Sequence, residues 1–199
     1  MANLEICYII NLCVRWCLKL NIGIDIDNTL TNTSIVSNTL VKEDKLYHGV
    51  LDYHDLNKEE AKDFLSKYLE QVVWDIDIKE DALEVLKYWK NKGYKLIFIT
   101  ARGVEETNNK SNIKSIYLTS LYFISKGITF DELVFFQENK GITCKKYNLD
   151  LFIDDKERVL DDVKKVGIKT LRITDDKESK HDIVHNWLEI KDYVDSLGV

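Results

Sequence analysis

The sequence predicts an α/β fold, in which a parallel β-sheet carries helices on both faces and a small helical cap is inserted after the first strand. The main observation is a repeated succession of a short apolar run, an amphipathic segment and a glycine, which is typical of βαβ units. A second observation is the break in this succession at residues 33–77. The third is a length of 199 residues with 45% hydrophobic side chains, which suits one domain with a substantial core.

Residues 1–19 form an N-terminal extension before the first predicted strand. The segment is apolar, but Glu5 is misplaced for the basic start of a signal peptide, and Arg15 and Lys19 interrupt the apolar run. Crossing a bilayer needs about 20 uninterrupted apolar residues. We therefore expect a helix docked on the surface or a stretch that precedes the folded domain, and no membrane partner.

Five apolar runs are predicted to be the buried strands of the sheet. The first, Leu20–Ile26, is rich in isoleucine and ends in polar turn residues. The others are Tyr94–Thr100, Leu133–Phe136, Leu149–Ile153 and Lys169–Ile173.

The predicted helices lie between these runs and have one apolar face each. Glycine follows three of them, as expected at a helix C-terminus. The predicted helical segments are Ala82–Trp89 before Gly93, Ser111–Lys126 before Gly127, Val159–Val166 before Gly167, and a terminal helix within Asp182–Leu197 that Trp187 anchors to the core.

The cap comprises residues 33–77, and the core domain comprises residues 20–32 and 78–199. Two cap helices are predicted, around Ser34–Val41 and Lys58–Val73, with a connector rich in Tyr, His and Asp. Ligands of open α/β sheets bind outside the carboxyl ends of the strands, so an insertion at this point becomes a lid. The connector side chains Tyr47, His48, Tyr53 and His54 are candidates to contact a base or sugar, although packing or surface roles are the simpler interpretation.

The net charge and the cysteines limit which classes of ligand and which cellular environment are expected. The net charge of −6 disfavours nucleic-acid polymers, which need clustered Lys and Arg, but it leaves room for a small phosphorylated metabolite. The four cysteines, Cys7, Cys13, Cys17 and Cys144, form no CxxC pair and have no histidine at zinc-ligand spacing. We therefore predict a reducing, cytoplasmic environment, and the sequence leaves the oligomeric state open.

Reactive side chains gather where the predicted strands end. Carboxylates follow the first strand (Asp25, Asp27) and the fourth (Asp154, Asp155); Thr100 and Arg102 close the second strand, and Lys140 stands before the helix that leads to the fourth. In a parallel sheet these ends meet at one edge. This convergence, more than any single motif, indicates an active site.

These residue types suit phosphoryl transfer. A carboxylate can attack phosphorus to form an aspartyl-phosphate, but its charge repels the phosphate, so a divalent cation is needed between them. Mg²⁺ prefers oxygen ligands and needs only one or two carboxylates, which Asp154 and Asp155 can supply. Thr100 and Lys140 would then bind the oxygens of the transferred phosphoryl group.

The order Asp25-x-Asp27-x-Thr29, Thr100, Lys140 and Asp154-Asp155 resembles motifs one to four of the haloacid dehalogenase-like (HAD) phosphohydrolases over about residues 20–175. The resemblance implies a Rossmann-like core. It makes Asp25 the nucleophile and Asp27 the general acid/base, whose backbone carbonyl also binds Mg²⁺. It assigns phosphate or substrate binding to Thr29, Thr100, Ala101, Arg102 and Lys140, and the metal site to Asp25, Asp27, Asp154 and Asp155.

Several alternatives stay open at this stage. Lys145 or Lys146 could replace Lys140 as the third motif, and Arg102 could be either a phosphate ligand or an exposed structural arginine. The chain is also similar to the 5′(3′)-deoxyribonucleotidase-like branch and its bacterial relatives, but Ala101-Arg102 stands where that branch has Ser-Pro-like residues.

Rival functions are hydrolysis of another phosphometabolite such as a sugar phosphate, phosphoryl transfer or mutase chemistry through the same aspartate, and a binding module that keeps only the fold. The binding module is disfavoured because all the catalytic residue types are present. Haloalkanoate dehalogenation is disfavoured because it needs neither Asp27 nor a metal.

Overall fold

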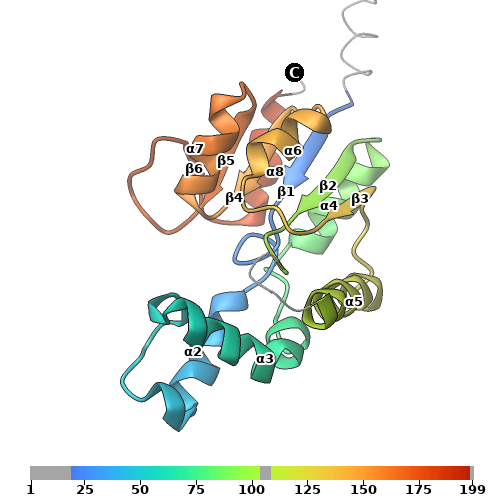
Figure 1. The fold of residues 1–199 in the computed structure, drawn as a ribbon. Coiled ribbons are helices and arrows are strands. Elements are labelled where there is room, and N and C mark those ends of the chain that lie inside the picture. The colour runs from blue at the N-terminus through green and yellow to red at the C-terminus, as the bar shows by residue number, and fades with distance from the viewer. Residues whose placement is uncertain (1–18, 104–108, 198–199) are drawn as a thin grey trace, which may run out of the picture.

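A six-stranded parallel sheet forms the centre of the fold (Figure 1). The computed structural model describes residues 19–103 and 109–197. The strand order is β3-β2-β1-β4-β5-β6, so that β1 is central. The strands are β1 (Asn21–Ile24), β2 (Lys95–Ile99), β3 (Glu132–Val134), β4 (Leu151–Asp154), β5 (Lys169–Ile173) and β6 (Asp182–Val184). The predicted α/β class with a parallel sheet is therefore confirmed.

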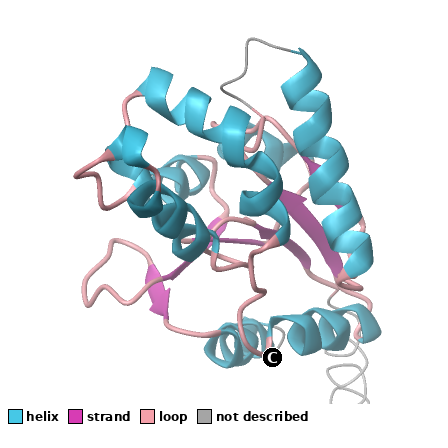
Figure 2. Cartoon of the chain, turned by 90° about the horizontal axis from the view of Figure 1, so that it is seen from below, coloured by secondary structure: helices cyan, strands magenta, loops and turns pink. Residues whose placement is uncertain are grey.

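Helices cover both faces of the sheet, as the view from the cap end shows (Figure 2). Side chains of α4 (Ala82–Asn91), α5 (Asn109–Ser125) and α8 (Trp187–Leu197) pack in one apolar cluster with Ile22 and Ile24 of β1. Side chains of α6 (Lys140–Lys146) and α7 (Glu157–Lys165) pack in a second cluster on the other face. The alternation of side chains along each strand produces these two layers.

Gly23, in the middle of β1, makes room for the second cluster. A Cβ atom at this position would lie 2.3 Å from Cδ1 of Leu149 and 2.6 Å from Cδ2 of Phe152. Both distances are well below van der Waals contact. The central strand therefore needs glycine so that Phe152 of β4 can pack beside it.

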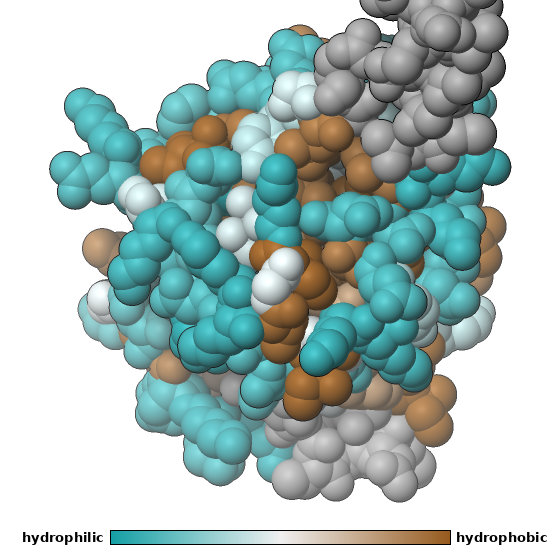
Figure 3. Space-filling view, turned by 90° about the horizontal axis from the view of Figure 1, so that it is seen from above, coloured by the Kyte–Doolittle hydropathy of each residue, from teal (hydrophilic) through white to brown (hydrophobic). Residues whose placement is uncertain are grey.

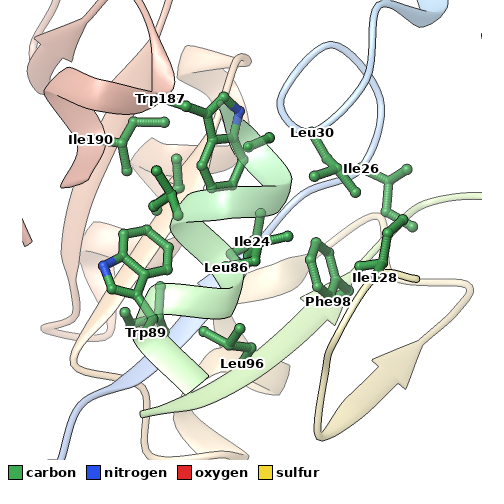
Figure 4. Close-up of a cluster of buried hydrophobic side chains, with 14 of the residues drawn as sticks. Ile24, Ile26, Leu30, Leu86, Trp89, Leu96, Phe98, Ile128, Trp187 and Ile190 are labelled. Atoms are coloured by element: carbon green, nitrogen blue, oxygen red, sulfur yellow. The ribbon is translucent and has the colours of Figure 1, made fainter. Parts of the chain in front are cut away.

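The larger apolar cluster is built around α4. Val85, Leu86 and Trp89 of this helix are almost completely buried against Ile24 and the neighbouring strand β2 (Figure 4). Their spacing of three and four residues places them on one face of the helix, as the sequence predicted. Gly93 then takes a positive φ of 79°, which allows the chain to turn into β2.

Most element boundaries shift by one or two residues from the prediction, and two differences have a clear structural reason. The segment Asp182–Leu197 is not one helix: its first three residues form β6, which pairs with β5, and α8 begins at Trp187. Pairing with β5 satisfies the backbone of Asp182–Val184, and this contact between distant segments outweighs the local helical pattern. The third strand ends at Val134 instead of Phe136, because Phe136 adopts a positive φ of 62°.

The inserted residues form a helical cap at the carboxyl ends of the strands, below the sheet in Figure 1. It consists of α2 (Thr33–Glu43), α3 (Lys58–Trp74) and two short 3₁₀ turns, η1 (Lys45–Tyr47) and η2 (Tyr53–Asp55). Its apolar core is separate from the two clusters of the sheet and contains Val41, Tyr47, Leu56, Ala61, Phe64 and Val72.

The two chain segments that connect cap and core pair with each other. Asn32 N donates to Asp77 O at 2.9 Å, and Lys79 N donates to Leu30 O at 2.9 Å. Thr31 and Ile78 form an antiparallel bridge between them. The chain thus enters and leaves the cap through two paired segments next to the end of β1, while Leu69 and Val73 of α3 pack into the larger apolar cluster of the core.

The end of the molecule opposite the cap carries a mainly hydrophilic surface with apolar side chains between the charged ones (Figure 3). Among the described residues, none of the helices combines the length and the apolar character needed to cross a bilayer.

Candidate active site

Asp25 lies at the centre of the carboxyl edge of the sheet, one residue after β1. Its N–H donates to Ile153 O of β4 at 2.9 Å, which fixes the backbone between two strand ends. The residue is only 6% exposed. A carboxylate in this position is held rigidly and is removed from bulk water.

Lys140 is the first residue of α6 and points to this carboxylate. Its Nζ donates to Asp25 Oδ1 and, at 2.8 Å, to Asp154 Oδ2, and its side chain is 3% exposed. Lys145 and Lys146 lie exposed at the other end of α6. The structure therefore brings Lys140, and not its two neighbours, to the predicted site.

The buried charges of this group alter one another's pKa values. Burial raises the pKa of Asp25 well above its usual value, and Asp154 adds to the effect, while Lys140 opposes it. Burial lowers the pKa of Lys140, but the two carboxylates outweigh it and raise the pKa above its usual value. Lys140 therefore stays charged in this environment and can stabilise negative charge.

Asp27 is held by a bidentate ion pair with Arg102. Arg102 donates from Nη2 to Oδ1 at 2.7 Å and from Nε to Oδ2 at 3.0 Å, and the Thr33 hydroxyl donates to Oδ1 at 2.7 Å. Burial raises the pKa of Asp27, but the charge and hydrogen bonds of Arg102 dominate and lower it to about 2. Asp27 is thus ionised at neutral pH.

Arg102 is not the exposed structural arginine that the sequence left open. Its side chain is 7% exposed, and Nη1 donates to the Thr119 hydroxyl of α5 at 3.0 Å. The guanidinium therefore joins Asp27 of the core to α5. The sequence carries no local signal for this pair, because the two residues are 75 positions apart.

Asp25, Asp154 and Asp155 can present one oxygen each within 4.8 Å of one another. Asp155 Oδ1 is buried and has no hydrogen-bond partner among the described residues. Burial and the neighbouring Asp154 raise the pKa of Asp155 to about 7, as expected for carboxylates that crowd together. Three close oxygens with excess negative charge fit a hard divalent cation. The side chain of Asp27 is not part of this cluster.

Two of the predicted binding residues lie away from the cavity. Thr29 and Thr100 are fully buried and do not line the cavity at this edge. The Thr100 hydroxyl accepts a hydrogen bond from Arg102 N at 3.1 Å, so it supports the loop that carries Arg102. Ala101 does line the cavity.

A cavity of about 320 Å³ lies between the core and the cap. The core side is lined by Asp25, Asp27 and Lys140. The cap side is mainly apolar and aromatic, with Tyr53 and His54 of η2 and Phe64, Leu65, Leu69, Val72 and Val73 of α3. Sequence reasoning missed the contribution of α3, because its inner face shows the same apolar spacing as any packed helix.

Two further residues of the cavity wall were missed, Lys156 and Arg158. They follow Asp154-Asp155 directly in the sequence. This position in the sequence could have identified them as cavity residues, because residues just after a strand end lie at the same sheet edge.

Comparison with known proteins finds relatives of the same fold. No family model matches the chain. A Clostridium acetobutylicum protein described as a nucleotidase is 27% identical over 194 residues, which cover 90% of this chain and 95% of that protein. A haloacid dehalogenase-like family hydrolase from Streptococcus pneumoniae superposes with a TM-score of 0.59 at 16% identity, covering 88% of this chain and 98% of the other.

The fold is that of the HAD-superfamily hydrolases. A Clostridium difficile protein provisionally assigned as a phosphatase shares it with a TM-score of 0.63 at 15% identity, over 88% of this chain and 98% of that one. The Rossmann-like fold that the resemblance implied is therefore confirmed. In HAD terms, the structure brings the first, third and fourth motifs into direct contact, through Asp25, Lys140 and Asp154.

Proposed function

We propose that the protein hydrolyses phosphomonoesters, with Asp25 as the nucleophile. The observation that carries this proposal is the buried group formed by Asp25, Lys140 and Asp154 at the floor of an open cavity. A structural ion pair alone would not need a cavity beside it. The HAD-superfamily neighbours and the nucleotidase relative support the same reaction class.

The reaction would proceed in two displacements at phosphorus. In the first, a carboxylate oxygen of Asp25 bonds to phosphorus, the bond to the leaving oxygen breaks, and Asp27 gives that oxygen a proton. In the second, water attacks the phosphorus of the aspartyl-phosphate and gives its proton to Asp27. Phosphate leaves, and both aspartates return to their starting states.

The environment of Asp27 favours the second of these steps. A carboxylate with a pKa of about 2 is ionised, and only the ionised form accepts a proton from water. In the first step Asp27 must hold a proton, which the ion pair with Arg102 opposes. We therefore propose that protonation of the leaving group is the step that depends most on the Arg102 contact.

A magnesium ion would be held by Asp25, Asp154 and Asp155, together with the backbone carbonyl of Asp27. When bound, it would offset the repulsion between these carboxylates and the phosphate. Lys140 places a second positive charge beside Asp25, where phosphoryl oxygens arrive. Thr100 is buried at the neighbouring strand end and would act indirectly, by accepting the hydrogen bond from Arg102 N that supports the loop carrying Arg102.

The favoured substrate is a nucleoside monophosphate. The nucleotidase relative supports this choice. So does the shape of the cavity, which is charged on the core side and apolar on the cap side, with the rings of Tyr53 and Phe64 in the wall. A nucleotide has the same division between a charged phosphate and a flat base.

A screen of phosphomonoesters with Mg²⁺, including ribo- and deoxyribonucleoside monophosphates and sugar phosphates, tests the proposal by release of inorganic phosphate. We expect turnover by the wild type and none by Asp25→Asn, whose circular dichroism should match the wild type. Equal turnover by both proteins would refute the role of Asp25. Addition of an alcohol acceptor in the same assay separates hydrolysis from phosphoryl transfer, which would yield a phosphorylated acceptor instead of phosphate.

A further inference from the structure

Lys156 and Arg158 place two unpaired positive charges on the wall of the cavity. They come from the junction of β4 with α7 and from the first turn of α7. Both side chains are exposed and line the same cavity as Asp25. Within the described part of the chain, neither side chain forms an ion pair or a hydrogen bond.

In the buried part of the site, carboxylates outnumber the positive charges. Its four carboxylates, those of Asp25, Asp27, Asp154 and Asp155, face two cations, which gives a formal charge of −2 when all are ionised. Lys140 is occupied by Asp25 and Asp154, and Arg102 is occupied by Asp27. A bound divalent cation would raise this formal charge only to zero. A phosphate dianion therefore needs further positive charge in order to enter.

Lys156 lies in a suitable place to supply that charge. Its ammonium is close enough to Asp27 and Asp155 to oppose the effect of burial on the pKa of each. It also adds to burial in lowering the pKa of His54, which belongs to η2 of the cap. Lys156 also lines the same cavity as Asp27 of the core and His54 of the cap. Glu138 is the one exposed carboxylate among the cavity-lining residues that opposes it.

We propose that Lys156 and Arg158 form an anion-binding pair that receives the phosphate group of the substrate at the mouth of the cavity. This proposal rests on the proposed phosphatase function and names two residues that bind the substrate in addition to the buried group. Because the two charges are exposed, they act by attraction and by charge-assisted hydrogen bonds, which weaken as salt rises.

Lys156→Gln and Arg158→Gln test the pair, with inorganic phosphate as the probe. We expect each substitution to raise the KM for the phosphomonoester and the inhibition constant of phosphate about tenfold, the usual size of one charge-assisted hydrogen bond. The change should lie in KM and not in kcat, and it should shrink at high ionic strength. Lys165→Gln, at the far end of the same helix, removes the same charge away from the cavity and should change neither constant.

The outcomes separate this inference from the function on which it rests. If the wild type hydrolyses phosphomonoesters and both glutamine variants keep the wild-type KM and phosphate inhibition, phosphate binding by the pair is refuted and the proposed phosphatase function is supported. A loss confined to kcat would also refute it. If the wild type hydrolyses none of the compounds, the affinity for inorganic phosphate is measured by calorimetry in the presence of Mg²⁺ and compared between the variants. Weaker binding by both variants than by Lys165→Gln supports the pair, and equal binding contradicts it.

Discussion

Replacing Asp155 by asparagine should stabilise the metal-free protein, and the gain should grow with pH. Burial and Asp154 raise the pKa of Asp155 to about 7, whereas an unfolded chain keeps an aspartate near 4. The folded state thus binds the proton more tightly than the unfolded state. Between these two pKa values a rise in pH ionises the unfolded chain first, so stability falls until pH 7 and then levels off.

The size of the effect follows from the pKa difference. A rise of about 3 pH units in the pKa costs the folded state about 4 kcal/mol at pH 8 and only about 1–2 kcal/mol at pH 5. These are upper limits, because Asp155 is partly exposed. Asparagine keeps the shape of the side chain but carries no charge, so Asp155→Asn should remove most of this cost. For a chain of this length, 1 kcal/mol corresponds to about 2–4 °C in melting temperature.

Thermal melts of both proteins in EDTA at pH 5 and pH 8 measure the prediction. The variant should melt higher at pH 8 by about 4–12 °C, and the difference should be much smaller at pH 5. Addition of Mg²⁺ should raise the melting temperature of the wild type at pH 8 more than that of the variant, because a ligand of the folded state stabilises it. A variant that melts lower at pH 8, or by the same margin at both pH values, would refute the reasoning.

Three further predictions concern residues outside the metal cluster. Arg102→Gln removes the charge that holds the pKa of Asp27 near 2. Because Asp27 must hold a proton in the first displacement, the limb of the kcat/KM profile on which activity falls with rising pH should move to higher pH, and an unmoved limb would show that Asp27 does not control it. Trp187→Phe deletes the hydrogen bond from Nε1 to Thr29 O (3.1 Å) and leaves a gap in the core. We expect the free energy of unfolding, measured with urea, to fall by about 2 kcal/mol. An unchanged unfolding midpoint would contradict the role of Trp187 in docking the terminal helix. Phe64→Ala leaves a cavity in the apolar core of the cap and should lower its stability by about 3–5 kcal/mol. Amide hydrogen exchange should therefore accelerate in α2 and α3 and not in β1. Equal acceleration in all three elements would argue against a separate cap core.

The sequence was sufficient to predict how the proposed catalytic side chains converge, because parallel strands bring their carboxyl ends to one edge. Asp25 and Asp154 follow adjacent strands, and their meeting needs no knowledge of packing. Lys140 could be preferred over Lys145 because it begins its helix at that edge. These inferences depend on the order of strands and helices along the chain, which the local sequence patterns predict well.

Contacts that depend on packing could not be predicted. The pair between Asp27 and Arg102 depends on how the loop after β2 turns toward β1, and α5 contributes Thr119 to it. The strand β6 has only three residues and exists because β5 offers a free edge. The apolar cap wall around Phe64 has the spacing of an ordinary helix, and only the docked position of α3 turns it toward the cavity.

The central claim is that Asp25 carries the phosphoryl group, and trapping of the acyl phosphate tests it most directly. The protein is mixed with a hydrolysed phosphomonoester and Mg²⁺, quenched in acid during turnover and treated with borohydride, which reduces an aspartyl-phosphate to homoserine. Peptide mass spectrometry should then find homoserine at position 25 in the wild type, and no modified residue in Asp25→Asn or in a sample without substrate. Turnover by the wild type with position 25 unmodified, or with the label on another aspartate, would contradict the account.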